Sequence, residues 1–72
     1  MTWRYQIIKR RGTEPYYEIG EVYLDKDGGI ESWTERGVGA VGDTPKEVIT
    51  SLKMMLADTR NPVFEEPPDD NL

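Results

Sequence analysis

Carboxylates and aromatic side chains are the main residues available for chemistry in this sequence, because histidine and cysteine are both absent. A chain without them cannot build a Ser-His-Asp or Cys-His nucleophile, an imidazole metal ligand or a thiolate zinc site. The remaining acid–base candidates are 14 Asp and Glu residues, and no spacing sets one pair apart from the others. We therefore expect no catalytic residues, no metal and no cofactor, in a protein that is not an enzyme.

The segment Asp25-Lys26-Asp27-Gly28-Gly29 has the alternating carboxylates with which a calcium-binding loop begins. Such a loop needs a glycine at its sixth position and a Glu at its twelfth, where this chain has Ile30 and Arg36. The same segment fits a three-residue hairpin turn that is closed by a glycine with positive φ. The sequence therefore predicts a turn here.

The aromatic residues Tyr23 and Trp33 are predicted to lie, with Ile8, on the face of a sheet that is turned away from the helix. Large aromatic side chains on such a face are typical of protein-binding surfaces, since they combine apolar area with a polar group. Met54 lies on the outer side of the predicted helix and joins them as a candidate. The alternative is that these residues pack on their strand neighbours or under the loop 37–42.

Four basic residues, Arg4, Lys9, Arg10 and Arg11, lie close together near the start of the chain. With the neighbouring aromatic residues they form a candidate nucleic-acid-binding strip. The chain as a whole has a net charge of -5, which disfavours binding to phosphate backbones. The alternative is that these bases pair with acidic residues across the sheet and in the acidic tail.

Three segments have the apolar and aromatic pattern of β-strands: residues 3–10, 16–24 and 30–35. Gly and Pro between the first two predict a long hairpin. The alternation in the second segment changes phase, so we predict a bulge at Gly20-Glu21.

The turn at residues 25–29 sets the predicted register of the second and third strands. In this register Leu24 lies opposite Ile30, and Glu21 lies opposite Trp33. Trp33 is then expected to face away from Val22 and Leu24.

A helix is predicted over residues 45–58, because Thr44, Pro45 and Glu47 form a capping box with proline at the first helical position. Helical spacing collects the apolar residues on one stripe of roughly 120°, which we expect to pack on the sheet. The stripe consists of Val48, Ile49, Leu52, Met55 and Leu56.

These elements predict an α+β fold in which a three-stranded antiparallel meander carries one C-terminal helix on one face, in the order β-β-β-α. The single domain is expected to cover residues 1–64 and to be followed by a disordered acidic tail, residues 65–72. The chain has no long apolar run and begins without the apolar stretch of a signal peptide, so we expect no membrane contact and a location in the cytoplasm.

The stretch Gly37-Val38-Gly39-Ala40-Val41-Gly42-Asp43-Thr44-Pro45-Lys46-Glu47-Val48, followed by Ile49 and Leu52, resembles the Gly-Asp-Thr-x-x-Glu start of a helix in HicB-type antitoxin domains. The resemblance covers residues 37–56, and it implies a domain that binds and blocks a toxin ribonuclease. Tyr16-Tyr17 and Trp33-Thr34-Glu35 are similar to elements of small bacterial or phage proteins.

Taken together, the sequence predicts a non-catalytic protein-binding module of bacterial or phage origin that binds a protein partner or a second copy of itself. A HicB-like antitoxin is a narrower form of this hypothesis. Nucleic-acid binding through the basic N-terminal strand is the alternative from a different class.

Overall fold

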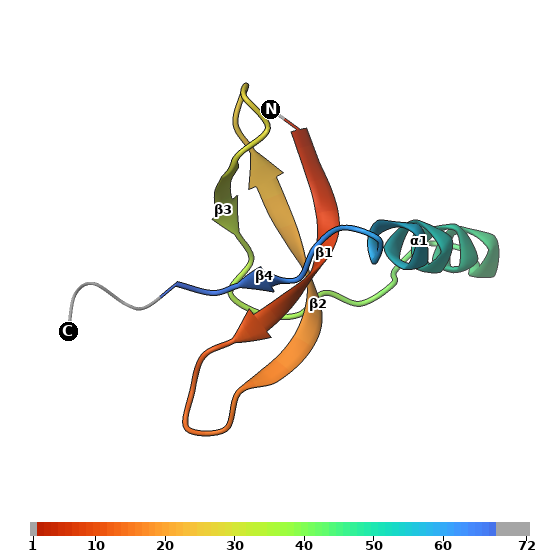
Figure 1. Cartoon of the computed structure of the whole chain (residues 1–72). Helices are drawn as coiled ribbons and strands as arrows, with labels where there is room; N and C mark the ends of the chain where they lie inside the picture. The colour runs from red at the N-terminus through yellow and green to blue at the C-terminus, as the bar shows by residue number, and fades with distance from the viewer. Residues whose placement is uncertain (1, 68–72) are drawn as a thin grey trace.

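One mixed sheet and one helix make up the computed structural model, which describes residues 2–67. The elements follow in the order β1 (Thr2–Arg10), β2 (Tyr16–Leu24), β3 (Ile30–Trp33), α1 (Pro45–Asp58) and β4 (Phe64–Glu65). Neighbours in the sheet are ordered β3-β2-β1-β4 (Figure 1). The α+β class predicted from the sequence is confirmed. No helix within residues 2–67 has the length and apolar character to cross a membrane.

The hairpin of β1 and β2 is the longest pairing in the sheet, and its register is regular from Thr2 opposite Leu24 to Arg10 opposite Tyr16. The bulge predicted at Gly20-Glu21 is therefore wrong. The change of phase in β2 arises because both faces of this strand carry apolar side chains, with Ile19 on one face and Val22 and Leu24 on the other.

The turn between β2 and β3 forms as predicted. The Gly28 backbone N–H donates to the Asp25 carbonyl over 3.1 Å, and Gly28 has the positive φ of 85° that this turn requires. Leu24 lies opposite Ile30, but a register shift between Tyr23 and Leu24 then moves the pairing by one residue.

This shift overturns the predicted placement of Trp33. Trp33 lies opposite Val22 and not opposite Glu21, so it shares a face with Val22 and Leu24. Because side chains alternate along a strand, a shift by one residue exchanges the two faces. Tyr23 accordingly lies on the other face from Trp33.

The three-stranded meander is also incomplete, because β4 adds a fourth strand parallel to β1. Phe64 lies opposite Ile8 and Glu65 lies opposite Lys9, and the Glu66 N–H donates to the Lys9 carbonyl over 3.1 Å. The domain boundary predicted after residue 64 therefore falls inside a strand. The disorder predicted for residues 68–72 lies outside the described residues.

The core fills the concave face of this curled sheet. Its centre is made of Ile8, Val22 and Leu24, and Ile30, Trp33 and Phe64 pack around them. Trp33 from β3 and Phe64 from β4 meet with their ring centroids 5.0 Å apart. Because β3 and β4 are the two edges of the sheet, this contact covers the concave face with the sheet's own side chains.

Gly20 allows Ile8 to occupy the centre of that core. A Cβ atom at residue 20 would lie 2.5 Å from Ile8 Cδ1 and 2.9 Å from Thr34 Oγ1. Both distances are shorter than van der Waals contact, so a side chain at residue 20 would force the ends of Ile8 and Thr34 to move.

We predict that Gly20→Ala lowers the free energy of unfolding by about 1–3 kcal/mol, because the added methyl group overpacks the core. Adding Ile8→Val, which removes Cδ1, is expected to recover part of this loss. Gly39→Ala is the control, since nothing lies within 4 Å of a Cβ at that position. Urea denaturation measures all three variants, and a Gly20→Ala protein as stable as Gly39→Ala would contradict the packing argument.

Candidate functional site

Helix α1 begins with the capping box that the sequence predicts. The Glu47 N–H donates to Thr44 Oγ1 over 3.2 Å, and the Asp43 N–H donates to Glu47 Oε2 over 3.1 Å. Proline occupies the start of the helix, and Asp58 ends it, as expected. The start of helix α1 is therefore determined by local sequence signals.

The helix is attached to the sheet through β1 and projects away from it (Figure 1). Met55 is its one buried residue. Near the end of the helix, Asp58 Oδ2 accepts a hydrogen bond of 3.0 Å from the Tyr5 N–H. Trp3 and Tyr5 face the helix, so α1 lies on the opposite face of the sheet from the core residue Ile8.

The predicted packing of the apolar stripe on the sheet is therefore largely wrong. Ile49, Leu52 and Leu56 are 52%, 53% and 73% exposed. They stand at positions i, i+3 and i+7 and lie along one side of the helix, which we name the aliphatic stripe. The helix turns Met55 toward the sheet and Val48 is half-buried, so the aliphatic stripe lies to one side of the contact.

The charged residues around the aliphatic stripe are all basic. Residues three or four positions apart are neighbours on a helix surface. By this spacing Lys46 and Lys53 are neighbours of Ile49, and Lys53 is also a neighbour of Leu56. Arg60 follows the helix, two residues after its end at Asp58. These three bases are exposed, and we call them the basic rim.

The two acidic residues of the helix lie away from the aliphatic stripe. Glu47 accepts the hydrogen bonds of the capping box, and Asp58 accepts the Tyr5 N–H. The aliphatic stripe thus carries local positive charge in a chain whose net charge is -5.

A shallow groove of about 460 Å³ runs between α1 and β1 on the other side of the helix. Trp3, Tyr5, Val41 and Met54 supply its apolar lining. The rings of Trp3 and Tyr5 meet edge to face with their centroids 5.1 Å apart. Met54 is half-exposed beside this groove. It lies opposite the aliphatic stripe, as predicted, but this side of the helix faces Trp3 and Tyr5 of β1, so the predicted outward position is wrong.

The four predicted protein-binding residues do not form one surface. Ile8 is fully buried, and Trp33 packs on the core beside Phe64. Tyr23 lies on the opposite face, where its hydroxyl donates to Glu21 Oε1 over 2.8 Å. This hydrogen bond, together with burial and the charge of Glu21, raises the pKa of Tyr23. The predicted open face around Tyr23 and Trp33 is therefore absent.

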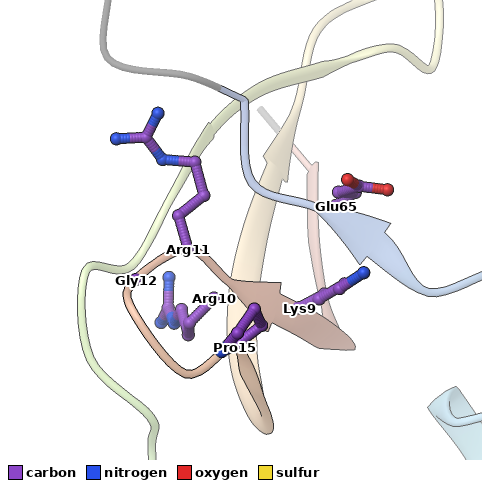
Figure 2. Close-up of a pocket in the computed structure, with 6 residues that line it drawn as sticks. All are labelled: Lys9, Arg10, Arg11, Gly12, Pro15 and Glu65. Atoms are coloured by element: carbon purple, nitrogen blue, oxygen red, sulfur yellow. The ribbon is translucent and has the colours of Figure 1, made fainter.

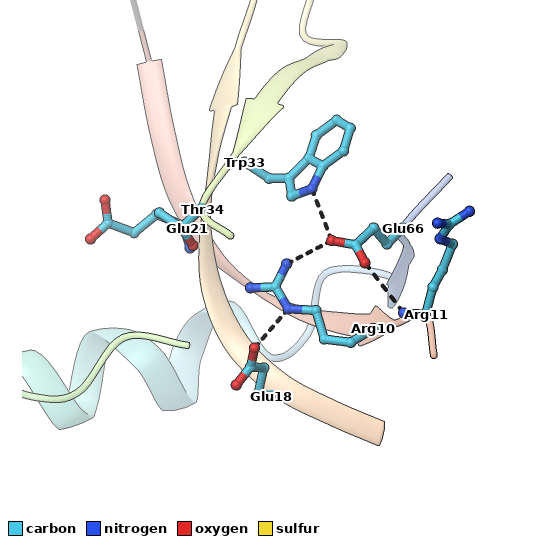
Figure 3. A network of polar contacts seen from close by, with 7 residues as sticks. All are labelled: Arg10, Arg11, Glu18, Glu21, Trp33, Thr34 and Glu66. Carbon is cyan, nitrogen blue, oxygen red and sulfur yellow. Dashed lines mark hydrogen bonds and ion pairs between the residues drawn. The ribbon is translucent and has the colours of Figure 1, made fainter. Parts of the chain in front are cut away.

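The four basic residues predicted to bind nucleic acid do not form one free surface either. Arg10 is buried, and its Nε pairs with Glu18 Oε1 over 2.7 Å while its Nη1 pairs with Glu66 Oε2 over 3.1 Å (Figure 3). Arg4 Nε donates to Gln6 Oε1 over 2.9 Å. The predicted alternative, pairing of these bases with Glu18 and with the acidic tail, is confirmed for Arg10.

Lys9 and Arg11 line a small cavity of about 190 Å³ at the end of β1, together with Arg10, Gly12, Pro15 and Glu65. Figure 2 shows the side chains of Lys9 and Arg11 pointing in different directions. Since Arg10 is neutralised by two carboxylates and Glu65 adds a third, this cavity is not a concentrated positive site.

Glu66 connects the C-terminal segment to the end of β1 and to the far edge strand β3. Its carboxylate accepts hydrogen bonds from the Arg11 N–H, the Trp33 indole and Arg10 (Figure 3). Burial alone would raise the pKa of Glu66, but these hydrogen bonds and the charge of Arg10 outweigh it and lower that pKa.

The comparisons with known proteins add no family assignment. No protein-family model, curated protein or solved structure matches the chain. Among residues 2–67, no group of three or more Asp or Glu residues is placed to hold a metal ion.

The aliphatic stripe is the functional candidate that sequence reasoning assigned to the core. Its spacing was visible in the sequence, but the same spacing is typical of a buried helix face. The basic neighbours Lys46, Lys53 and Arg60 were the available signal that this side faces away from the sheet.

Neighbouring residues in α1 test this division of the helix. We predict that Met55→Ala lowers the free energy of unfolding by about 2–4 kcal/mol, because it leaves a cavity, whereas Leu56→Ala costs less than about 1 kcal/mol. Thermal and urea unfolding measure both. Equal losses in the two variants would mean that Leu56 is buried in solution.

The bonds around Glu66 predict a pH dependence of stability. Because its pKa is lower in the folded chain than the ordinary value of 4.5, its contribution is complete above about pH 5 and is lost as the pH falls through the folded-state value. We expect Glu66→Gln to reduce the loss of stability between about pH 5 and pH 3. Urea midpoints at several pH values measure this, with Glu65→Gln as the neighbouring control. Parallel pH profiles for native protein and Glu66→Gln would contradict the role of Glu66.

Proposed function

We propose that this protein is a non-catalytic protein-binding module whose binding element is helix α1. The observation that carries the proposal is the aliphatic stripe, in which three large side chains of one helix side are at least half-exposed. Anchors at i, i+3 and i+7 are the pattern by which an amphipathic helix fills a groove on another protein.

The structure of the core supports the same function. Trp33 and Phe64 cover the concave face of the sheet, so the aliphatic stripe is not needed to complete the core. Exposed aliphatic residues that form a contiguous row are typical of interaction sites, whereas isolated ones are common on any surface.

The resemblance of residues 37–56 to HicB-type antitoxin domains supports the same class of function, since it implies binding of a protein. This segment contains the capping box and most of α1. A toxin-binding role is the narrower form of the proposal.

Nucleic-acid binding has less support than protein binding. Of the four bases proposed for it, Arg10 is buried between two carboxylates and Arg4 is hydrogen-bonded to Gln6. A phosphate backbone would therefore meet Lys9 and Arg11 beside Glu65.

The test of the proposal is affinity capture from nuclease-treated lysate of the source cells. We expect the native chain to retain a protein partner and the double variant Leu52→Ser/Leu56→Ser to retain at least about tenfold less, because the apolar anchors are removed. Tyr16→Ser/Tyr17→Ser is the matched control, since these side chains are equally exposed on the first hairpin. Circular dichroism establishes that each variant is folded. Equal capture by folded native and Leu52→Ser/Leu56→Ser proteins would remove α1 as the binding element.

A further inference from the structure

The charges around the aliphatic stripe restrict what can cover it. Lys46, Lys53 and Arg60 are the charged residues three or four positions from its members, and all three are exposed. The aliphatic stripe is therefore apolar with bases around it: Lys53 lies beside it on the helix, Lys46 lies toward the groove between α1 and β1, and Arg60 follows the end of the helix.

From this arrangement we propose that the partner of α1 is a different protein that presents an apolar groove rimmed by carboxylates. The inference rests on the proposed function and specifies the chemistry of the partner. Ile49, Leu52 and Leu56 would fill the groove, while Lys46, Lys53 and Arg60 would meet acidic side chains on its rim. Complementary charge of this kind accelerates association and fixes the register of the helix in the groove.

Symmetric pairing of α1 with the same helix of a second copy does not provide this complement. In a two-fold antiparallel helix pair, Ile49 of one copy faces Leu56 of the other, which brings Lys53 beside Lys53. Like charges at an interface oppose association. The acids of α1 do not offset this repulsion, since Glu47 and Asp58 lie on the side of the helix that faces β1. The net charge of -5 on each copy adds to it.

The experiment is site-specific photo-crosslinking in lysate of the source cells. The photoreactive amino acid p-benzoyl-phenylalanine replaces Leu56, the most exposed member of the aliphatic stripe, or Lys26 in the hairpin turn as a position control. Mass spectrometry identifies the crosslinked protein and segment. Charge dependence is tested in the same protein with Lys46→Glu/Lys53→Glu. Lys46→Arg/Lys53→Arg preserves the charge, and Lys26→Glu/Arg36→Glu makes the same change of net charge at exposed sites outside the helix.

The expected result is a crosslink from position 56, and none from position 26, to an apolar segment of another protein that is flanked by Asp or Glu. Lys46→Glu/Lys53→Glu should reduce it by about tenfold, and the other two double variants should leave it near the native level. Raising the salt concentration should weaken the native crosslink.

Three other results would overturn the inference, and they separate it from the proposed function. A crosslink to another protein that survives charge reversal, or that joins a segment without acidic residues, removes the carboxylate rim and leaves α1 as a binding element. A crosslink to a second copy replaces the partner with a homodimer. No crosslinked protein above the position-26 control, together with no protein captured by the native chain, removes both the inference and the proposed function.

Discussion

The contact between the two edges of the sheet is the constraint on which the rest of the structure depends. Trp33 at the end of β3 and Phe64 at the start of β4 meet over Ile8, Val22 and Leu24. Glu66 adds polar contacts beside this pair of rings: its carboxylate accepts a hydrogen bond from the Trp33 indole and forms an ion pair with the buried Arg10. A charge such as Arg10 is tolerated inside a protein when it is paired, so burial of Arg10 requires Glu18 and Glu66 to stay in place. The two-residue strand β4 is thereby held by more than its few backbone bonds.

Closure of the sheet on itself changes the role of the helix. In a simple α+β domain the helix covers the apolar face of the sheet, and its own apolar side is used in doing so. Here α1 lies on the opposite face, and its aliphatic stripe stays exposed. Full burial of a Leu or Ile side chain contributes roughly 1.5–3 kcal/mol to the free energy of folding or binding. The three residues of the aliphatic stripe are at least half-exposed, so roughly 2–5 kcal/mol of this contribution is not realised in the free chain. That amount becomes available when a partner covers the stripe, before the costs of association are subtracted.

The sequence predicted the features that depend on local chemistry and missed those that depend on distant pairing. The capping box of Thr44 and Glu47 and the turn at Gly28 form as predicted, since each is determined by a few adjacent residues. The predicted face of Trp33 was wrong because a shift of the strand register between Tyr23 and Leu24 exchanges the two sides of β3. Strand β4 was missed because two residues carry no periodicity, and its pairing with β1 joins distant parts of the chain. The exposed stripe was assigned to the core for a related reason: helical spacing shows that a helix has an apolar side, but not what covers it.

The distribution of charge follows from the same closure. Arg10, the base nearest the core, is paired with the carboxylates of Glu18 and Glu66. The acids of α1, Glu47 and Asp58, lie on the side of the helix that faces β1. What remains on the outer side of the helix is therefore basic, although the chain as a whole is acidic. Net charge governs the encounter of whole molecules, whereas the charges within a few ångströms of an apolar contact decide which surface can cover it. Two copies of this acidic protein repel each other as whole molecules, and pairing of α1 with α1 would bring like charges together. A partner whose apolar groove carries carboxylates would instead attract the bases around the aliphatic stripe.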